Sequence, residues 1–377
     1  MAKYKLGDIA PIQQGSVPES ESYWLLNLDM VESNTGHIYE CLYVPFDKIG
    51  TSTIAFDTNN VLYSKLRPYL NKVVIPDCPG YATSEMLPLK PNKNYITREY
   101  LTYFLRSPKF VAYINEKTSG AKMPRANSSD LKSVEIECPT LENQRHITSE
   151  FDRIISIVRL RQQQLQKLDE LVKARFVEMF GDMVHNPNNW KKVNLGSVCD
   201  VRDGTHDSPK YFSEGYPLVT SKNVTSGRID FTDCSLICKE DYNKINERSK
   251  VDFGDILMPM IGTVGKPVIV DVDADFAIKN VALIKFYENS KVINIFVRAL
   301  LQSDYFDCVV ISKIRGGTQK FISLSDIRKL EICLPPMDTQ NEFAAFVEQT
   351  DKSKVAIQKA LDEAQLLFES LMQKYFG

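Results

Sequence analysis

The chain contains one segment twice, and this repeat constrains its fold more than any other feature. Residues 129–181 align with residues 325–377 without a gap, at a separation of 196 positions, and both copies end in Phe-Gly. The starts also match, because Leu-Gly-Asp-Ile at 6–9 returns as Leu-Gly-Ser-Val at 195–198, a separation of 189. The difference between the separations places insertions in the middle of the copies. We therefore expect two domains on one plan, with diverged middles.

Each copy joins a region of mixed strand and turn signals to a stretch with helical periodicity. In each copy the region of strand and turn signals spans about 130 residues. It contains runs rich in β-branched residues, such as 73–75 in the first copy and 267–270 in the second, that favour strands. A stop containing proline follows, and apolar residues then recur every three or four positions, without Pro or internal Gly, up to Phe-Gly. This pattern predicts two helices of about 38 residues, each roughly 57 Å long.

Each of these helices would expose an apolar stripe if it stood alone. We expect the two to cover one another as an antiparallel coiled coil, and the alternative is that each packs on its own domain. The predicted fold class is α+β, with two pseudo-symmetric α/β domains separated by the two helices. The predicted segments are a first domain at 1–139, a central helix at 140–181, a linker at 182–192, a second domain at 193–335 and a C-terminal helix at 336–377.

Common catalytic motifs are absent from the sequence. Residues 262–267 are too short for a nucleotide-binding P-loop and lack its hydroxyl residue, and neither G-x-S-x-G nor H-E-x-x-H occurs. The chain has only four His, and the closely spaced Cys234 and Cys238 have no second pair at metal-ligand spacing. We therefore expect no catalytic residue and no metal site in this chain.

The cysteines and the N-terminus indicate a compartment. The eight cysteines are scattered and mostly lie singly in apolar stretches, which is typical of reduced thiols. The first residues lack the apolar core of a signal peptide, and no run of about 18 apolar residues could span a membrane. We expect a cytoplasmic protein.

Charge is distributed unevenly, although the net charge is only −2. Residues 60–132 hold twelve Lys and Arg against five Asp and Glu, and residues 279–329 hold nine against four. These basic zones occupy corresponding parts of the two copies and contain aromatic residues and Gly-rich turns. Such zones favour nucleic-acid binding, because Lys and Arg neutralise phosphates and Arg reads guanine edges. For any single Lys, an ordinary solvated surface is the alternative.

Twelve residues are candidates for contact with DNA. Most lie in the basic zones, and two belong to the turn-rich loop at 203–209, where His206 either donates to DNA or is an ordinary exposed turn residue. The candidates are Lys65, Arg67, Lys72, Lys122, Arg125, Thr205, His206, Lys222, Lys266, Arg315, Gln319 and Lys320.

Several segments, taken in order, resemble a known family. They are residues 6–9, 62–72, 80–85 and 120–125, the helix entries at Gln144 and Gln340, and residues 203–206, 254–257 and 262–265. With these segments on a duplicated plan, the whole chain resembles the specificity subunit of type I restriction–modification systems.

The resemblance implies a function and a set of partners. Each α/β domain would be a target recognition domain that docks on one half of a bipartite, asymmetric site in double-stranded DNA. The helices would set the gap between the half-sites and dock two methyltransferase subunits, which two restriction/translocase subunits join. The resemblance places S-adenosylmethionine, ATP and Mg²⁺ on these partners, with no cofactor in this chain.

Three other functions remain open at this point. A stand-alone two-headed DNA-binding protein would bind a defined site tightly without partners. A coiled-coil scaffold for other proteins would show no DNA-dependent behaviour. An unrecognised nuclease or methyltransferase would act on DNA unaided.

Overall fold

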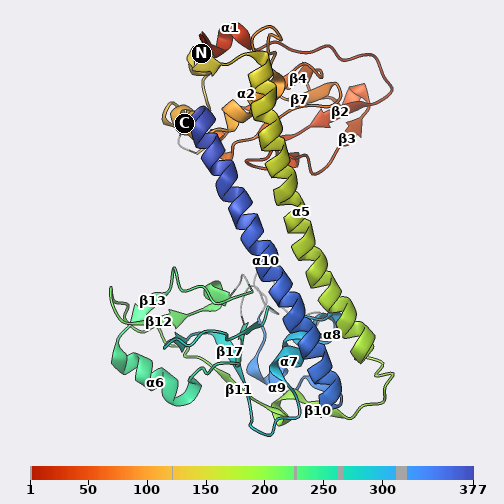
Figure 1. Ribbon diagram of the computed structural model, residues 1–377, viewed down its shortest axis with the longest axis vertical. Coiled ribbons are helices and arrows are strands. Elements are labelled where there is room, and N and C mark those ends of the chain that lie inside the picture. The colour runs from red at the N-terminus through yellow and green to blue at the C-terminus, as the bar shows by residue number, and fades with distance from the viewer. Residues whose placement is uncertain (1, 121, 225–226, 261–265, 311–320) are drawn as a thin grey trace. The chain divides into compact units, whose positions relative to one another are not determined.

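The computed structural model describes residues 2–120, 122–224, 227–260, 266–310 and 321–377 (Figure 1). The chain divides into two compact units. Unit 1 contains Met1–Gln162 together with Lys359–Gly377, and unit 2 contains Gln163–Gln358. The two longest helices therefore each contribute one part to each unit.

Unit 1 is a mixture of short strands and helices. Its strands are β1 (Ala2–Lys5), β2 (Tyr23–Leu26), β3 (Leu42–Val44), β4 (Thr53–Phe56), β5 (Val61–Ser64), β6 (Val73–Val74), β7 (Gly80–Thr83), β8 (Met86–Leu89) and β9 (Glu135–Cys138). Its helices are α1 (Leu6–Ile9), η1 (Leu28–Met30), η2 (Phe46–Lys48), η3 (Pro68–Leu70), α2 (Arg98–Arg106), α3 (Pro108–Glu116), α4 (Ser128–Ser133) and the first part of α5 (Leu141–Phe180).

Unit 2 contains the corresponding elements in nearly the same order. Its strands are β10 (Lys192–Asn194), β11 (Cys199–Asp203), β12 (Tyr216–Val219), β13 (Ser235–Ile237), β14 (Ile256–Pro259), β15 (Val268–Ile269), β16 (Ala277–Ile278), β17 (Val281–Phe286) and β18 (Glu331–Cys333). Its helices are η4 (Leu195–Ser197), η5 (Ser221–Val224), α6 (Lys239–Ser249), α7 (Asn294–Leu301), α8 (Asp304–Val309), α9 (Leu324–Arg328) and the first part of α10 (Met337–Phe376).

The sheets of the two units share most of their topology, although among the described residues β4 of unit 1 and β11 of unit 2 each lack a counterpart strand. In unit 1 the strand orders are β3-β2-β7-β4, β6-β5-β8 and β1-β9, and in unit 2 they are β13-β12-β16, β15-β14-β17-β11 and β10-β18. The pairs β2–β7 and β12–β16 are parallel, and every other pair between these strands is antiparallel. Among the described residues, α6 of unit 2 has no counterpart helix in unit 1. The middle of the second copy therefore differs, as the two separations predict.

Helices α2 and α3 of unit 1 begin where the sequence supplies capping residues. The Thr97 hydroxyl accepts the Tyr100 N–H at 3.2 Å, and the Ser107 hydroxyl accepts the Phe110 N–H at 3.3 Å before Pro108. At the far end of α5, Gly181 follows with a φ of +70°, a conformation that glycine adopts without steric cost. These caps fix the ends of helices that the apolar pattern alone leaves uncertain.

A buried glutamine joins each unit to its long helix. In unit 1 the Gln144 side chain accepts the Thr97 N–H at 2.9 Å and donates to the C=O groups of Tyr95 (2.7 Å) and Pro139 (2.9 Å). The corresponding glutamine of unit 2 is Gln340, and its side chain makes the same three bonds. Its partners are Ile293, Lys291 and Pro335, each 196 positions after its counterpart in unit 1. The ungapped register of the repeat therefore begins at least as early as residue 95.

The long helices pack against each other within each unit, and they do so antiparallel. In unit 1 the ring of Phe151, early in α5, lies 5.3 Å from that of Phe368, late in α10. In unit 2 the ring of Phe176, late in α5, lies 5.6 Å from that of Phe343, early in α10. All four lie in or against the cores of their own units. The two packing modes considered from the sequence thus occur together, and the predicted α+β class with two long antiparallel helices is confirmed.

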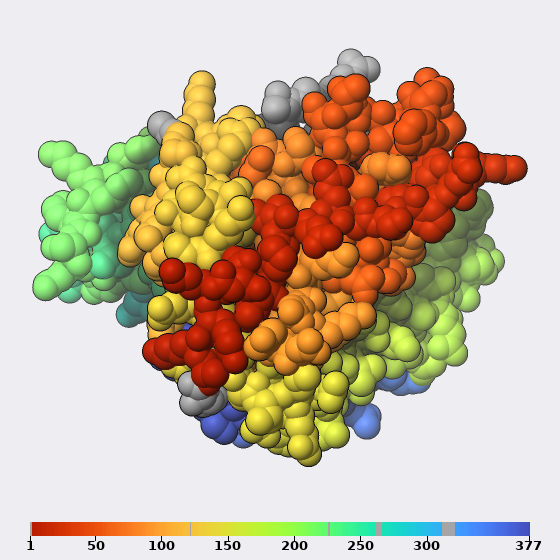
Figure 2. All heavy atoms as spheres, turned by 90° about the horizontal axis from the view of Figure 1, so that it is seen from above, coloured from red at the N-terminus to blue at the C-terminus, as the bar shows by residue number. Residues whose placement is uncertain are grey.

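The N-terminal strand of unit 1 pairs with the last strand of the same unit. β1 pairs antiparallel with β9, the strand directly before α5, so that Tyr4 lies opposite Ile136. Figure 2 shows this first segment, in red, lying on the surface against yellow and orange parts of the same unit. The equivalent pair of unit 2 is β10–β18. Among the described residues, no helix is long and apolar enough to cross a membrane.

Candidate nucleic-acid interface

Three loops of unit 1 converge beside the ends of β5 and β8. They are the β5–β6 loop, the turn between β7 and β8, and the loop between α3 and α4. Backbone bonds join them, since the Lys65 N–H donates to the Glu85 C=O and the Ala126 N–H donates to the Lys65 C=O, both at 2.9 Å. The Arg67 N–H donates to the Pro124 C=O at 2.7 Å. The candidates Lys65, Arg67 and Arg125 are thereby brought to one place, although up to 60 positions separate them in the sequence.

An acidic side chain lies among these basic ones. Glu85 Oε1 accepts from Arg125 Nη2 at 2.9 Å, and Glu85 Oε2 accepts from Arg125 Nε at 3.2 Å, which is a bidentate pair. Lys65 Nζ lies 4.0 Å from Glu85 Oε2. The hydrogen bond to Glu85 raises the pKa of the Arg125 guanidinium above its usual value. Arg125 is therefore a cation held in a fixed direction rather than a freely rotating surface charge.

The other candidates of unit 1 have different surroundings. Lys72 Nζ donates to the Leu28 C=O at 2.7 Å, so its ammonium group is already hydrogen-bonded inside the unit. Arg67 has a φ of +49°, and its Nε is buried without a hydrogen-bond partner. Lys122 is exposed. All three remain predictions as DNA contacts, and Lys122 is the most accessible of them.

In unit 2, His206 is held from both sides. Its Nδ1 lies 2.7 Å from Asn280 Oδ1 and its Nε2 lies 2.9 Å from Asp203 Oδ2. The His206 side chain is 61% exposed, whereas that of Asp203 is 8% exposed. Arg248 from α6 forms an ion pair with the other oxygen of Asp203. Thr205, another candidate, forms an isolated parallel β-bridge with Lys279. This backbone pairing keeps the loop beside the β16–β17 turn.

The remaining candidates of unit 2 lie on neighbouring loops. Lys222 is exposed in η5, beside Ser221, whose hydroxyl donates to the Asn280 C=O at 3.3 Å. Lys266 is exposed in the β14–β15 loop. The candidates Arg315, Gln319 and Lys320 lie outside the described residues.

One backbone contact beside the candidates corresponds between the units. The Ile322 N–H donates to the Met260 C=O at 3.0 Å, as Ala126 donates to Lys65, and Ile322 follows Ala126 by 196 positions. The residue directly after β14 therefore occupies the place of the residue directly after β5. The plan is shared but the side chains differ, since Met260 stands where unit 1 has Lys65.

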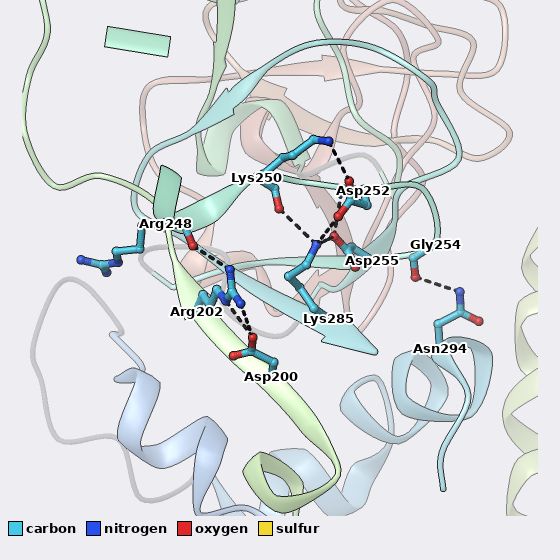
Figure 3. A network of polar contacts seen from close by, with 9 residues as sticks. All are labelled: Asp200, Arg202, Arg248, Lys250, Asp252, Gly254, Asp255, Lys285 and Asn294. Atoms are coloured by element: carbon cyan, nitrogen blue, oxygen red, sulfur yellow. Dashed lines mark hydrogen bonds and ion pairs between the residues drawn. The ribbon is translucent and has the colours of Figure 1, made fainter. Parts of the chain in front are cut away.

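A network of charged side chains around Lys285 and Arg202 has its partners within unit 2. Figure 3 shows Lys285 directed at two carboxylates, with Nζ 2.5 Å from Asp255 Oδ2 and 2.8 Å from Asp252 Oδ2. Burial raises the pKa of Asp255, while the hydrogen bond to Lys285 lowers that of Asp252. Arg202 joins Asp200 to the C=O of Arg248, the residue near the end of α6. This network fixes α6 against the sheet and so places Arg248 beside Asp203.

The described part of the chain contains no candidate metal cluster. No group of three or more His, Cys, Asp and Glu residues there could hold a metal ion. The eight cysteines are free thiols, and burial raises the pKa of Cys138 to about 11 and that of Cys199 to about 12. Such thiols stay protonated at neutral pH and are poor nucleophiles.

Sequence reasoning missed the residues that orient the candidates. Glu85 lies 40 positions from Arg125, and Asn280 lies 74 positions from His206. Glu85 belongs to a segment that carries the family resemblance, but a single acidic residue in a basic zone gives no signal of its partner. Asn280 has a φ of +55°, which Asn tolerates better than most residues, and this too is invisible without the fold.

The comparisons with known proteins agree on one family. The family described as "Type I restriction modification DNA specificity domain" matches residues 1–170 and 187–365. The MjaIX specificity subunit of Methanocaldococcus jannaschii is 23% identical over 411 residues, covering 98% of this chain and 91% of that protein. The MjaVIII specificity subunit of the same organism is 24% identical over 309 residues, covering 74% and 71%.

A solved structure supports the same fold. It comes from work titled "Structural basis underlying complex assembly and conformational transition of the type I R-M system" and is 19% identical. It aligns with a TM-score of 0.61 over 100% of this chain and 97% of its own. At this identity the likeness bears on the fold alone.

Proposed function

This chain belongs to the family of type I restriction modification DNA specificity domains, and on that premise we propose that it selects the DNA site on which a type I complex acts. Each unit reads one half of an asymmetric, bipartite site, and the long helices set the gap between the halves. The observation that carries this proposal is that the two units share one plan but carry unlike side chains at corresponding places, such as Lys65 in unit 1 and Met260 in unit 2. Two unlike readers on one plan suit two unlike half-sites, as identical readers suit a palindrome.

The proposed contacts divide into two kinds. Lys side chains such as Lys65 and Lys122 neutralise phosphates, which supplies affinity without sequence preference. Glu85 holds Arg125 and leaves it N–H groups to spare, which suits contact with a base edge. His206 is held through both ring nitrogens, which leaves its ring face and C–H edge for contact with DNA. A net charge of −2 limits the phosphate contribution, so we propose that the chain alone binds DNA weakly and that its partners complete the binding surface.

The chemistry belongs to the partners in this proposal. This chain acts as a non-catalytic subunit in the cytoplasm and docks two methyltransferase subunits and two restriction/translocase subunits. Those subunits use S-adenosylmethionine, ATP and Mg²⁺, and this chain holds no cofactor. Positioning by this chain lets the methyltransferase extrude its target adenine from the duplex.

The test is co-expression with its cognate methyltransferase subunit, followed by mapping of N6-methyladenine with and without this chain. We expect a bipartite motif with a fixed gap that appears only when this chain is present. An active methyltransferase that produces no such motif would contradict the proposal. Tight binding by the chain alone would then favour a stand-alone DNA-binding protein, methylation by the chain alone an enzyme, and no DNA dependence a scaffold.

Removing basic side chains from the loop cluster of unit 1 should weaken DNA binding by the assembled complex. We expect Lys65→Ala/Arg67→Ala and Lys122→Ala/Arg125→Ala each to lower affinity roughly tenfold or more, and to reduce the slope of log affinity against log salt by up to about 2. Fluorescence anisotropy at several salt concentrations measures both quantities.

The matched control is Lys5→Ala/Lys93→Ala, which removes two exposed charges of unit 1 from β1 and from the loop before α2. We expect the control to bind DNA as the wild type does. Thermal melting checks that each variant remains folded. Unchanged affinity in a folded Lys122→Ala/Arg125→Ala variant would remove that loop from the DNA-binding surface.

A further inference from the structure

One turn occupies the same place in both units and contacts a candidate DNA-binding side chain in each. It precedes the strand that pairs with β5 in unit 1 and with β14 in unit 2. Met86 lies opposite Ser64 in unit 1, and Val281 lies opposite Pro259 in unit 2. The residues after Ser64 and Pro259 are Lys65 and Met260, already matched by their backbone bonds. The residues before Met86 and Val281 are Glu85 and Asn280, which are therefore structural equivalents.

The contact in unit 1 determines which edge of Arg125 is available. Glu85 takes Nε and one N–H of Nη2, and the Met123 C=O lies 3.3 Å from Nη1. A guanidinium carries five N–H groups, so Nη1 and Nη2 each retain one. The terminal edge of the guanidinium consists of one N–H of Nη1 and one of Nη2, and this pair matches O6 and N7 of guanine. Glu85 contacts the other edge, formed by Nε and Nη2. Glu85 therefore occupies the side edge and leaves the base-reading edge of Arg125 open.

The contact in unit 2 fixes a ring in the same manner. Asn280 lies against Nδ1 of His206 and Asp203 lies against Nε2, so rotation of the imidazole would break both contacts. The Asn280 backbone is itself held, because its N–H donates to the Thr205 C=O at 3.2 Å. The His206 ring therefore has one orientation, and it can meet DNA only through its exposed ring face and C–H edge, because both nitrogens face partners inside the unit.

The charge of Glu85 argues against a role in affinity. A carboxylate repels phosphates and neutralises part of the positive charge around it, so it lowers nonspecific attraction to DNA. A fixed guanidinium, in contrast, rejects bases that lack the matching acceptors, since fewer alternative contacts are within its reach. A carboxylate at this place therefore lowers the affinity for nonspecific DNA and increases discrimination between bases.

We infer that Glu85 and Asn280 are positioning residues for sequence readout, Glu85 by holding Arg125 against a guanine in one half-site and Asn280 by holding His206 in the other. This inference rests on the proposed function and refines it. It assigns to one structural position in each unit an influence on base preference, although neither residue needs to contact a base itself.

The test uses the assembled methyltransferase complex with Glu85→Ala or Asn280→Gly, and maps N6-methyladenine for each. Glycine at position 280 removes the amide and keeps the left-handed backbone accessible. We expect Glu85→Ala to lower discrimination about tenfold at one guanine of one half-site, and to leave the other half-site unchanged. Asn280→Gly should relax the half-site that Glu85→Ala leaves intact. Glu85→Gln, which retains an acceptor, should fall between wild type and Glu85→Ala.

Two substitutions serve as matched controls. Glu137→Ala removes an exposed carboxylate of unit 1 that pairs with Lys3 at 3.2 Å. Asn189→Gly repeats the asparagine-to-glycine change at an exposed position of unit 2 whose φ is +52°. Both controls should keep the wild-type motif. Competition binding with unrelated DNA adds a second readout, in which Glu85→Ala should bind nonspecific DNA at least as well as the wild type.

The outcomes separate this inference from the proposed function. A wild-type complex without a bipartite motif would overturn both. A wild-type motif that Glu85→Ala and Asn280→Gly leave unchanged would overturn the inference alone. Loss of both half-sites together with a lower melting temperature in either variant would show a merely structural role and would also overturn it.

Discussion

Insertion of one heptad into each long helix should lengthen the gap in the recognised site by up to about three base pairs and leave both half-sites unchanged. Seven residues add about 10.5 Å to a helix, and successive base pairs of DNA lie about 3.4 Å apart. The insertions belong between residues 162 and 163 in α5 and between 358 and 359 in α10, where the helices pass from one unit to the other. Duplicating residues 156–162 and 352–358 preserves the local sequence. Methylation mapping of the assembled complex measures the gap.

The control for this result is the insertion in α5 alone. Within each unit the helices are antiparallel and share ion pairs, such as Lys354 with Asp169 at 2.7 Å. A single insertion displaces one helix against the other, so we expect loss of the motif and a lower melting temperature. An unaltered gap in the folded double-insertion variant would refute the proposal that the helices set the spacing.

Replacing either buried glutamine by alanine should lower the free energy of unfolding by about 3–5 kcal/mol. Gln144 and Gln340 are completely buried, and each satisfies one N–H and two C=O groups of the backbone. Alanine leaves these three groups without their partner, and each buried unsatisfied group costs about 1–3 kcal/mol. Urea denaturation measures the loss, and circular dichroism reports it through the long helices. Gln144→Ala should affect unit 1 and Gln340→Ala unit 2.

The matched control is Gln163→Ala, which removes an exposed glutamine of α5. An exposed helical position accepts alanine within about 0.5 kcal/mol. A loss below about 1 kcal/mol for Gln144→Ala would mean that water or a local shift satisfies the freed backbone groups. The glutamine would then be a marker of the repeat rather than a support of the fold.

The sequence was sufficient to predict the long helices because their apolar pattern is periodic and local. The apolar residues of α5 and α10 recur over about ten turns, and Phe-Gly marks both ends. In the sequence, the ungapped part of the repeat was visible only from residue 129 onwards. Its extension to residue 95 depends on the hydrogen bonds of Gln144 and Gln340, since Tyr95 and Lys291 share no chemistry as side chains. Backbone acceptors are equivalent whatever residue carries them.

The loop clusters could be predicted in location but not in geometry. Basic composition pointed to the β5–β6 and α3–α4 loops, and the fold brings Lys65 and Arg125 together there. Composition treats every Lys alike, however, and only the fold distinguishes Lys72, which donates to the Leu28 C=O, from the exposed Lys122. The residues that orient the candidates come from turns that are distant in the sequence. No local sequence pattern predicts contacts between such distant residues.

The division of the chain into units also governs the order of events during its synthesis. Unit 2 is one continuous stretch and can fold as soon as the ribosome releases it. Unit 1 cannot be completed then, because its core includes Met372 and Phe376, which are made after all of unit 2. At roughly 5–20 residues per second, the first 162 residues wait roughly ten to forty seconds for these partners. A nascent chain that stops before Met372 therefore carries an incomplete unit 1 and a complete unit 2. Such a chain is a natural target for chaperones and proteases.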